Sequence, residues 1–256
     1  MMNYPEPIHV NATTSTNSTL DELCNRQTVP ELTCIYTNYQ SEGRGQRGNT
    51  WESEDGANLL FSVVFFPDFL EANRQFLLSQ VNALALQETL SVYTDNIRVK
   101  WPNDIYWKDR KLCGTLIEND LIGMNLSRSI AGTGVNLNQK KFISNAPNPV
   151  SLSQITGKEY DIKIILQQIL ERTAYYYQLL KEGKDEIITS RYFSVLYRRE
   201  GFYTYRDTNG KFDARIVDIQ PSGKLILEDT EGKIRAYFFK EVACVLPDPK
   251  GKPIEL

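Results

Sequence analysis

The run ANLLFSVVFF, residues 57–66, is apolar at almost every position. A strand that is apolar on both of its faces is typical of a sheet whose two faces are both covered by other elements. The run is also short and is followed at once by Pro67 and Asp68, so it is too short to span a bilayer. It therefore predicts a strand buried in the interior of a layered α/β domain.

The neighbouring segments supply the other elements of such a domain. Residues 14–24, TSTNSTLDELC, offer an N-cap before apolar residues at helical spacing, which predicts a helix from about residue 16. Apolar residues between 69 and 92 predict one long amphipathic helix, and residues 161–197 predict a helical pair broken at KEGKDE. Strands are expected at LTCIYTNYQ, IRVKW, DIYW and KLCGTLIEN, with a further hairpin from LIGMNL and SRSIAGTGVNLN and a loop over 138–160.

The pattern changes after RREG, residues 198–201. The segments FYTYRD, FDARIVDIQ, KLILED and IRAYFFKEVACVL are short strand candidates separated by Asn-Gly, Pro-Ser-Gly and Glu-Gly turns. Closely spaced strands over about fifty residues are typical of a small β-barrel. We therefore expect two domains, a catalytic domain over residues 1–199 and a small barrel over residues 200–256.

A few counts exclude whole classes of chemistry. The chain has one histidine, His9. We therefore do not expect Ser–His–Asp catalysis, Cys–His catalysis or a metal site with several histidines. Its four cysteines are far apart in sequence, which indicates reduced thiols in a cytoplasmic protein. A net charge of −3 argues against broad binding to nucleic acid or to a membrane surface. The first ten residues, MMNYPEPIHV, have neither the basic nor the apolar region of a signal peptide, so none is expected.

Residues 42–52, EGRGQRGNTWE, gather glycines and arginines in one loop. Gly43, Gly45 and Gly48 permit close backbone approach, and successive N–H groups of such a loop can point at an anion. Arg44 and Arg47 add charge-assisted contacts to a phosphate or a carboxylate. No G-K-[ST] follows, so this is not a Walker A loop. On its own the segment is equally typical of a solvated loop.

Residues 100–114, KWPNDIYWKDRKLCG, form a second candidate. Asn103 can bond a ligand, and Asp104 can help to hold Mg²⁺ or to order a nearby lysine. Lys111 opens a predicted strand, where its ammonium would stabilise the charge that develops when a carboxylate attacks a phosphate. Gly114 leaves room for a ligand against the sheet. The alternative is a simple turn and hairpin with solvated lysines.

Two more segments have polar groups or bare backbone. TSTN offers hydroxyl and amide groups, although as an N-cap alone it is unremarkable. AGTGVNLN contains Gly132, Gly134 and Asn136, where backbone can approach a flat ligand, although such glycines also mark a bulge. Trp51 and Trp101 are most often packing residues, and either can cover a ring. The joint presence and order of these segments is more specific than any of them alone.

Taken together, these segments resemble the biotin protein ligases, which attach biotin to a lysine of carrier proteins. The resemblance is carried in order by STN (15–17), YQ (39–40), GRGQRGNTW (43–51), KWPND (100–104), KLCGTLIE (111–118) and GTGVN (132–136). It implies a mixed-sheet α/β (α+β) catalytic domain related to class II aminoacyl-tRNA synthetases, and a small C-terminal SH3-like β-barrel. It implies ATP, Mg²⁺ and biotin as the small molecules, and a biotin carboxyl carrier domain of acetyl-CoA or related carboxylases as the protein partner.

The resemblance also implies roles for individual residues. Biotin would be held by Ser15, Thr16, Asn17, Gln40, Gly43, Arg44 and Gly114. The nucleotide would be held by Gly45, Arg47, Gly48, Trp51, Asn103, Lys111, Gly132, Gly134 and Asn136. Lys111, Arg44 and Asp104 would carry the catalysis. No fixed metal site is expected, because Mg²⁺ would arrive with ATP, with Asp104 as a possible contact.

The sequence departs from the family pattern in two places. Many bacterial members have arginine where this chain has Gln46, so retention of the adenylate is expected to be weaker or to depend on Arg47. Many also begin with a DNA-binding winged helix, whereas about fourteen residues precede STN here. We therefore expect a ligase that does not bind DNA. A homodimer is common in the family, and nothing in the residues settles it.

Three other functions fit parts of the sequence. A lipoate or octanoate protein ligase would share the fold and the adenylate chemistry, but GRGQRG together with KWPND favours the biotin branch. An RNA-binding module would use the Gly/Arg loop and the barrel, against which the acidic composition argues. A non-catalytic carrier-binding protein would not need both Lys111 and Arg44.

Overall fold

A computed structural model describes residues 4–143 and 148–246 of the chain, without the side chain of Arg47. A seven-stranded sheet forms the larger part, and its strands are β1 (Ile8–Thr13), β2 (Cys34–Gln40), β3 (Leu59–Phe65), β4 (Ile97–Lys100), β5 (Asp104–Trp107), β6 (Arg110–Ile122) and β7 (Asn125–Val135). Its helices are α1 (Thr16–Arg26), α2 (Phe76–Ser91), α3 (Leu152–Thr156), α4 (Ile162–Lys181) and α5 (Asp185–Ser194).

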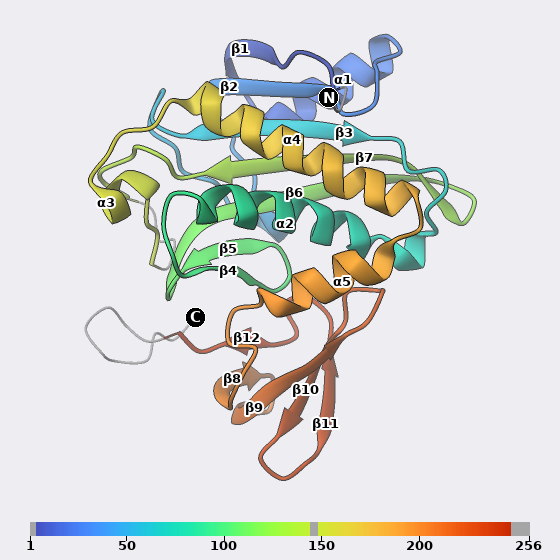
Figure 1. The fold of residues 1–256 in the computed structure, drawn as a ribbon, viewed down its shortest axis with the longest axis vertical. Helices are drawn as coiled ribbons and strands as arrows, with labels where there is room; N and C mark the ends of the chain where they lie inside the picture. The colour runs from blue at the N-terminus through green and yellow to red at the C-terminus, as the bar shows by residue number, and fades with distance from the viewer. Residues whose placement is uncertain (1–3, 144–147, 247–256) are drawn as a thin grey trace.

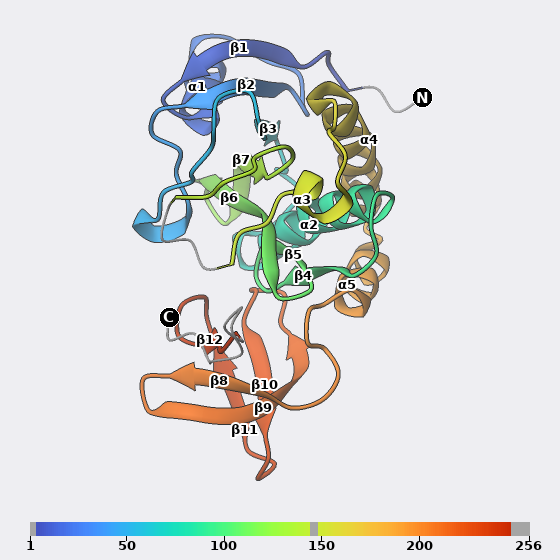
Figure 2. The same ribbon diagram turned by 90° about the vertical axis from the view of Figure 1, so that its left-hand side faces the viewer.

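The strands of this sheet lie in the order β1-β2-β3-β7-β6-β5-β4. The β1–β2 pair is parallel and every other pair is antiparallel, so the sheet is mixed as predicted. One face is covered by α1 and the opposite face by α2 and α4 (Figures 1 and 2). The chain thus has the layered α/β architecture that the apolar run indicated.

Strand β3 shows why both faces must be covered. Leu59, Phe61, Val63 and Phe65 alternate onto one face and join the main hydrophobic core with α2 and α4. Val64 faces the other way and packs in a second core with Leu20 of α1 and Ile130 of β7. Because side chains alternate along a strand, only an apolar residue at nearly every position can satisfy both cores.

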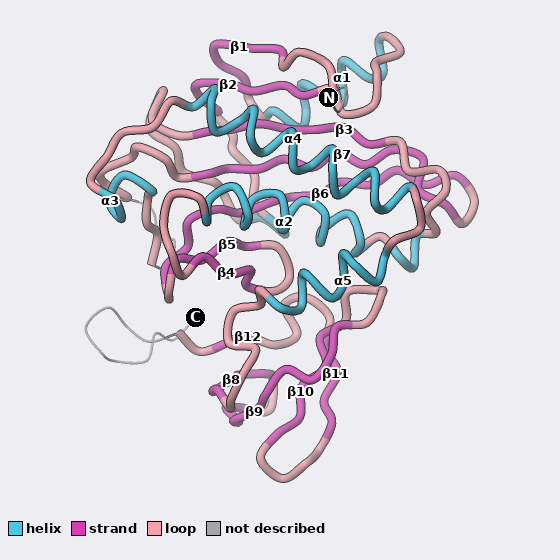
Figure 3. Tube along the Cα trace, viewed as in Figure 1, coloured by secondary structure: helices cyan, strands magenta, loops and turns pink. Residues whose placement is uncertain are grey.

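The C-terminal part is a second sheet of β8 (Tyr203–Asp207), β9 (Gly210–Ile219), β10 (Leu225–Asp229), β11 (Ile234–Tyr237) and β12 (Ala243–Cys244). The described part of this region contains strands and loops and no helix (Figure 3). The order is β11-β10-β9-β8-β12, and the end strands β11 and β12 do not pair within the described residues. The predicted SH3-like barrel is therefore wrong as a closed barrel. Strands of four and two residues at the two edges are too short to close the sheet on itself.

The second sheet contacts the first through the KWPND segment. The indole Nε1 of Trp101 donates a hydrogen bond of 2.9 Å to the carbonyl of Gly223 in the β9–β10 turn. Gly223 has a φ of +86°, and a Cβ there would lie 2.8 Å from the ring of Phe76 at the start of α2. A side chain at this turn would therefore push the C-terminal sheet away from α2.

The predicted helix over residues 69–92 is wrong in its first part, because α2 begins at Phe76. The preceding residues form a 3-10 turn (Ala72–Arg74), and the N–H of Ala72 donates to the carbonyl of Met124 in the β6–β7 hairpin. This tertiary contact takes the backbone donor that a longer helix would have used. Strand β1 was not predicted, and the β6–β7 turn lies inside LIGMNL rather than after it.

We predict that Leu84→Ala on α2 lowers the free energy of unfolding by about 2–5 kcal/mol, because Leu84 is fully buried and its removal leaves a cavity. Val92, which follows α2 and is 63% exposed, is the matched control. Val92→Ala is expected to change stability by less than about 0.5 kcal/mol. Urea denaturation of both variants measures the difference, and equal losses would contradict the assignment of Leu84 to the core.

Candidate active site

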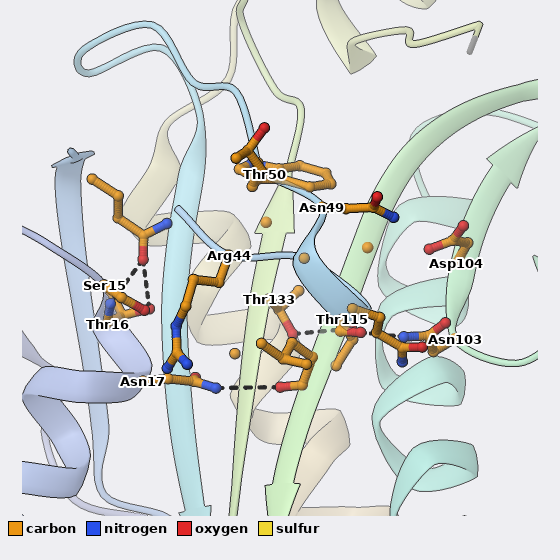
Figure 4. Close-up of a pocket in the computed structure, with 18 of the residues that line it drawn as sticks. Ser15, Thr16, Asn17, Arg44, Asn49, Thr50, Asn103, Asp104, Thr115 and Thr133 are labelled. Atoms are coloured by element: carbon orange, nitrogen blue, oxygen red, sulfur yellow. Dashed lines mark hydrogen bonds between the residues drawn. The ribbon is translucent and has the colours of Figure 1, made fainter. Parts of the chain in front are cut away.

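A cavity of about 150 Å³ opens on the α1 side of the main sheet. It is walled by the start of α1, the end of β2, the Gly/Arg loop and the adjacent strands β6 and β7. Figure 4 shows Ser15, Thr16 and Asn17 on one side of this cavity and Asn103 and Asp104 on the other. The predicted site residues that line it are Ser15, Thr16, Asn17, Gln40, Arg44, Gly45, Trp51, Asn103, Asp104, Lys111, Gly114, Gly132 and Gly134.

One end of the cavity is a cluster of buried polar groups. The backbone N–H of Thr16 donates to Gln40 Oε1 over 2.8 Å, and the Thr16 hydroxyl lies 3.1 Å from the same oxygen. Ser62 of β3 reaches this cluster from below, with Oγ 2.7 Å from Thr16 Oγ1. The cluster is fixed by the N-terminal turn of α1, which places residues 15–17 against the ends of two strands.

Arg44 is held at the edge of the cavity by a carboxylate. Its Nη1 and Nη2 atoms donate to the two oxygens of Glu118 over 2.9 and 3.0 Å, which is a bidentate pair. Glu118 Oε2 also accepts a hydrogen bond of 2.7 Å from Asn17 Nδ2. Both side chains of the Arg44–Glu118 pair are about half exposed, so the pair orients Arg44 and adds little to the stability of the fold.

The Gly/Arg loop is folded as a small hairpin. The N–H of Trp51 donates to the carbonyl of Gly43 over 2.8 Å, and the N–H of Gly45 donates to Asn49 over 2.6 Å. A 3-10 turn, Gln46–Gly48, forms its tip, where Gly48 has a φ of +85°. A Cβ on Gly43 would lie 2.7 Å from the Trp51 carbonyl, so the close approach of these two segments requires glycine.

The floor of the cavity is bare backbone. Gly114 of β6 lies opposite Gly134 of β7, and the Trp51 side chain lies over this pair. A Cβ on Gly134 would overlap the indole, and one on Gly132 would overlap the Asn17 amide. The Trp51 Nε1 is buried without a hydrogen-bond partner. The glycines thus make room for the Trp51 indole and the Asn17 amide directly on the sheet.

Lys111 lies at the other end of the cavity. Its Nζ is 2.8 Å from Asp104 Oδ1 and 5.8 Å from the centroid of a Trp51 ring. Its backbone is bonded on two sides, because its N–H donates to Asn148 and its carbonyl accepts from Val150. The backbone bonds hold the Lys111 main chain and the Asp104 carboxylate holds its ammonium, while the side chain remains 27% exposed.

The remaining predicted residues lie elsewhere. Gly43 and Gly48 line a shallow groove beside Arg44 and Glu118. Asn136 lines a larger cavity of about 750 Å³ between the main sheet and the C-terminal sheet, which also includes Lys111 and Asp104. Burial lowers the pKa of Lys100, whose ammonium borders the same cavity. The side chain of Arg47 lies outside the described residues.

Several contributors were not assigned from the sequence, among them Thr115 and Thr133 in the wall of the cavity. Glu118 lies within the KLCGTLIE motif and has no role predicted from the sequence, although it orients both Arg44 and Asn17. Ser62 stands inside an apolar strand, and a lone hydroxyl in such a run is a signal of a buried polar contact. Phe239 reaches the cavity from the C-terminal sheet and packs on Trp101. No sequence pattern predicts that contact, because it depends on how the two sheets meet.

Metal ligands do not gather at the site. Across residues 4–143 and 148–246, no three His, Cys, Asp or Glu side chains are close enough together to hold a metal ion. The expected entry of Mg²⁺ with ATP is not tested by this and stays a prediction.

In the same part of the chain no helix is long and apolar enough to cross a membrane.

Comparison with known proteins assigns the chain to a family. Residues 10–136 match the sequence model of the biotin/lipoate A/B protein ligase family. The chain belongs to this family. Among curated ligases of the family, the bifunctional ligase/repressor BirA of Bacillus subtilis (strain 168) is 28% identical over 245 residues, covering 90% of this chain and 71% of the relative. The biotin–[acetyl-CoA-carboxylase] ligase of Paracoccus denitrificans is 33% identical over 131 residues, covering 48% and 53%.

The likeness to a solved ligase structure covers more of the chain than the family model does. The biotin protein ligase of Aquifex aeolicus, in complex with biotin and ATP, superimposes with a TM-score of 0.77 and 26% identity. The likeness covers 94% of this chain and 98% of that one. The whole arrangement, including the C-terminal sheet, is therefore that of a biotin protein ligase.

We predict that Gly134→Ala destabilises the protein by about 1–3 kcal/mol, because the added methyl overlaps the Trp51 indole and nothing else is changed. The test is a double-mutant cycle with Trp51→Ala, read by urea denaturation. The cost of Gly134→Ala is expected to fall to less than about 1 kcal/mol in the Trp51→Ala background. An undiminished cost there would show that the clash lies elsewhere.

Proposed function

We propose that this protein is an ATP-dependent biotin protein ligase. It forms biotinyl-5′-AMP from biotin and ATP, and then transfers the biotinyl group to a lysine of a biotin carboxyl carrier domain. The observation that carries the proposal is the arrangement of the 150 Å³ cavity, which has neutral hydrogen-bonding groups at one end, sheet glycines covered by the Trp51 indole in the middle and an ammonium paired with Asp104 at the other end.

The first step brings two anions together. The biotin carboxylate attacks the α-phosphorus of ATP, a carboxylate–phosphorus bond forms and pyrophosphate leaves. Lys111 is placed to neutralise the carboxylate and the developing charge, and Arg44 borders the same cavity. Fixed cations of this kind are commonly worth a few kcal/mol to the transition state.

The second step needs a neutral amine. The acceptor lysine of the carrier attacks the acyl carbon of the mixed anhydride, a C–N bond forms and AMP leaves with the bonding electrons. Asp104 lines both cavities, so its carboxylate can bond an amine that enters from the larger one and can accept the proton that the amine loses on attack. Its bond to Lys111 supports a role in ordering that lysine.

Neither step of the reaction is attributed to a Mg²⁺ ion held by the protein alone. An aspartate oxygen such as Asp104 Oδ2 is a ligand type that Mg²⁺ accepts, and the ion usually keeps several waters and the nucleotide phosphates as its other ligands. It would neutralise phosphate charge when it arrives with ATP. Three points remain predictions. The acceptor is expected to be a carrier domain of acetyl-CoA or related carboxylases, the protein is expected not to bind DNA, and a homodimer is an open possibility within the family.

Lipoate or octanoate ligation is the second candidate, because the family includes lipoate ligases. An alkyl or dithiolane head group offers no N–H donor. Such a head would lie against the polar groups of Thr16 and Gln40 without bonding to them, so it would take them out of water with no compensating hydrogen bond. The polar end of the cavity therefore favours biotin.

We predict that ATP–pyrophosphate exchange depends on biotin and that Lys111→Ala lowers it by at least about 100-fold, since one fixed cation at the reacting centre is lost. Lys108→Ala is the matched control, because Lys108 lies in the same β5–β6 hairpin and packs over Trp107, away from the cavity. It is expected to retain exchange within about twofold of the unsubstituted protein.

Two outcomes would oppose the proposal. Exchange that lipoate supports and biotin does not would assign the protein to the other branch of the family. Near-normal exchange in Lys111→Ala, with a folded protein by circular dichroism, would remove Lys111 from the chemistry.

A further inference from the structure

The turn between β4 and β5, residues 101–103, leads directly into Asp104. In the described parts of the chain, no backbone–backbone hydrogen bond outside the helices and strand ladders involves these three residues. Side chains anchor the turn instead. The indole of Trp101 bonds to the C-terminal sheet, and Asn103 Nδ2 donates to the carbonyl of Thr115 on β6. The position of Asp104 therefore depends on side-chain contacts made by the residues before it.

A further anchor comes from the helices behind the turn. The hydroxyl of Tyr192 on α5 donates to the carbonyl oxygen of Pro102 over 3.0 Å, and Ser79 Oγ of α2 donates to the same oxygen over 3.4 Å. A carbonyl oxygen has two lone pairs and can accept both bonds. The shorter bond, from Tyr192, is the stronger of the two.

Tyr192 is a well-fixed donor. Its side chain is 1% exposed, and its ring packs edge-on against Phe76 with 5.7 Å between the ring centroids. Burial raises the pKa of the Tyr192 hydroxyl, so the group keeps its proton and donates at any working pH. Tyr192 lines neither the 150 Å³ cavity nor the 750 Å³ cavity. It can therefore act on the chemistry only through the turn that it holds.

The turn connects Tyr192 to the reacting end of the site. The Pro102 carbonyl belongs to the peptide group that joins Pro102 to Asn103, and Asp104 follows at the first position of β5. Asp104 Oδ1 is 2.8 Å from Lys111 Nζ. A shift of the Pro102 peptide would therefore move the carboxylate that holds this ammonium. Misplacing a reacting group by 1 Å can cost roughly 100-fold in rate.

We propose that Tyr192 is a positioning residue, whose hydroxyl fixes the Pro102 carbonyl so that Asp104 holds Lys111 in place for the attack of the carboxylate on ATP. The inference rests on the proposed function and adds to its machinery a residue that lines neither cavity. Without the Tyr192 hydroxyl, only the longer bond from Ser79 holds this carbonyl. The turn then gains freedom, and the ammonium is less often in position.

The test removes one hydroxyl from each of two buried tyrosines. Tyr192→Phe keeps the ring and its packing on Phe76. Tyr177→Phe is the matched control, because Tyr177 of α4 is 2% exposed, lines neither cavity and donates its hydroxyl to Glu31 over 2.6 Å. Biotin-dependent ATP–pyrophosphate exchange of both variants is measured at saturating ATP over a range of biotin concentrations.

Tyr192→Phe is expected to lower the kcat of exchange by about tenfold, because Lys111 is less often in place. Its KM for biotin is expected to stay within about twofold of the unsubstituted value, since the polar end of the cavity is not attached to the turn. Tyr177→Phe is expected to keep both kcat and KM within about twofold.

A second comparison separates positioning from a general weakening of the fold. Tyr192→Phe is combined with Asp104→Asn, which retains Lys111 and Arg44 and is expected to leave a lower but measurable exchange. In that background Tyr192→Phe is expected to change kcat by less than about twofold, because it acts through the carboxylate that is already lost. A general weakening would lower kcat by the same factor in both backgrounds.

Equal kcat values in Tyr192→Phe and Tyr177→Phe would overturn the inference, and so would a tenfold loss that persists in Asp104→Asn. If Tyr192→Phe does not fold, Ser79→Ala takes its place, because it removes the other donor to the same carbonyl. A lower kcat is expected there, and an unchanged kcat would also overturn the inference. Failure of the proposed function would look different, since the unsubstituted protein would then show no biotin-dependent exchange.

Discussion

The antiparallel pairing of β6 with β7 is the constraint on which the candidate site depends. It places Gly114 opposite Gly134, with Gly132 two residues earlier in β7, so three positions on the α1 face of the main sheet have no side chain. Trp51 and Asn17 occupy the space that side chains would fill. Everything else in the site is arranged around this bare surface. The apolar alternation of β3 holds the sheet between its two helical layers, and the start of α1 closes one end of the cavity.

The polar groups around that surface form one connected chain. Arg44 is paired with Glu118, Glu118 orients Asn17, and Asn17 orients Ser62. The Gly/Arg loop is thereby coupled to the buried polar end of the cavity through β6. A ligand anion that recruits Arg44 would compete with Glu118 for the guanidinium. The loop and the polar end are thus parts of a single site, although 25 residues, which include most of α1 and the whole of β2, separate Asn17 from Gly43 in the sequence.

Much of this could be predicted from the sequence. The apolar β3 run indicated a doubly covered sheet, and colinear motifs predicted most residues that line the cavity, including Thr16, Arg44 and Lys111. What could not be predicted depends on tertiary contacts. Helix α2 starts late because Ala72 bonds to the β6–β7 hairpin, and the C-terminal sheet stays open because its edge strands are short. Phe239 reaches the cavity only through the packing of two sheets, and Ser62 acts through partners that sequence spacing does not reveal.

The most direct measurement is a crystal structure of the protein with a non-hydrolysable analogue of biotinyl-5′-AMP. The account predicts that the ureido ring lies against Thr16 and Gln40, that the chain crosses the glycines of β6 and β7, and that the phosphate or its replacement contacts Lys111. An analogue bound wholly within the 750 Å³ cavity between the two sheets, with Thr16 and Gln40 untouched, would contradict it.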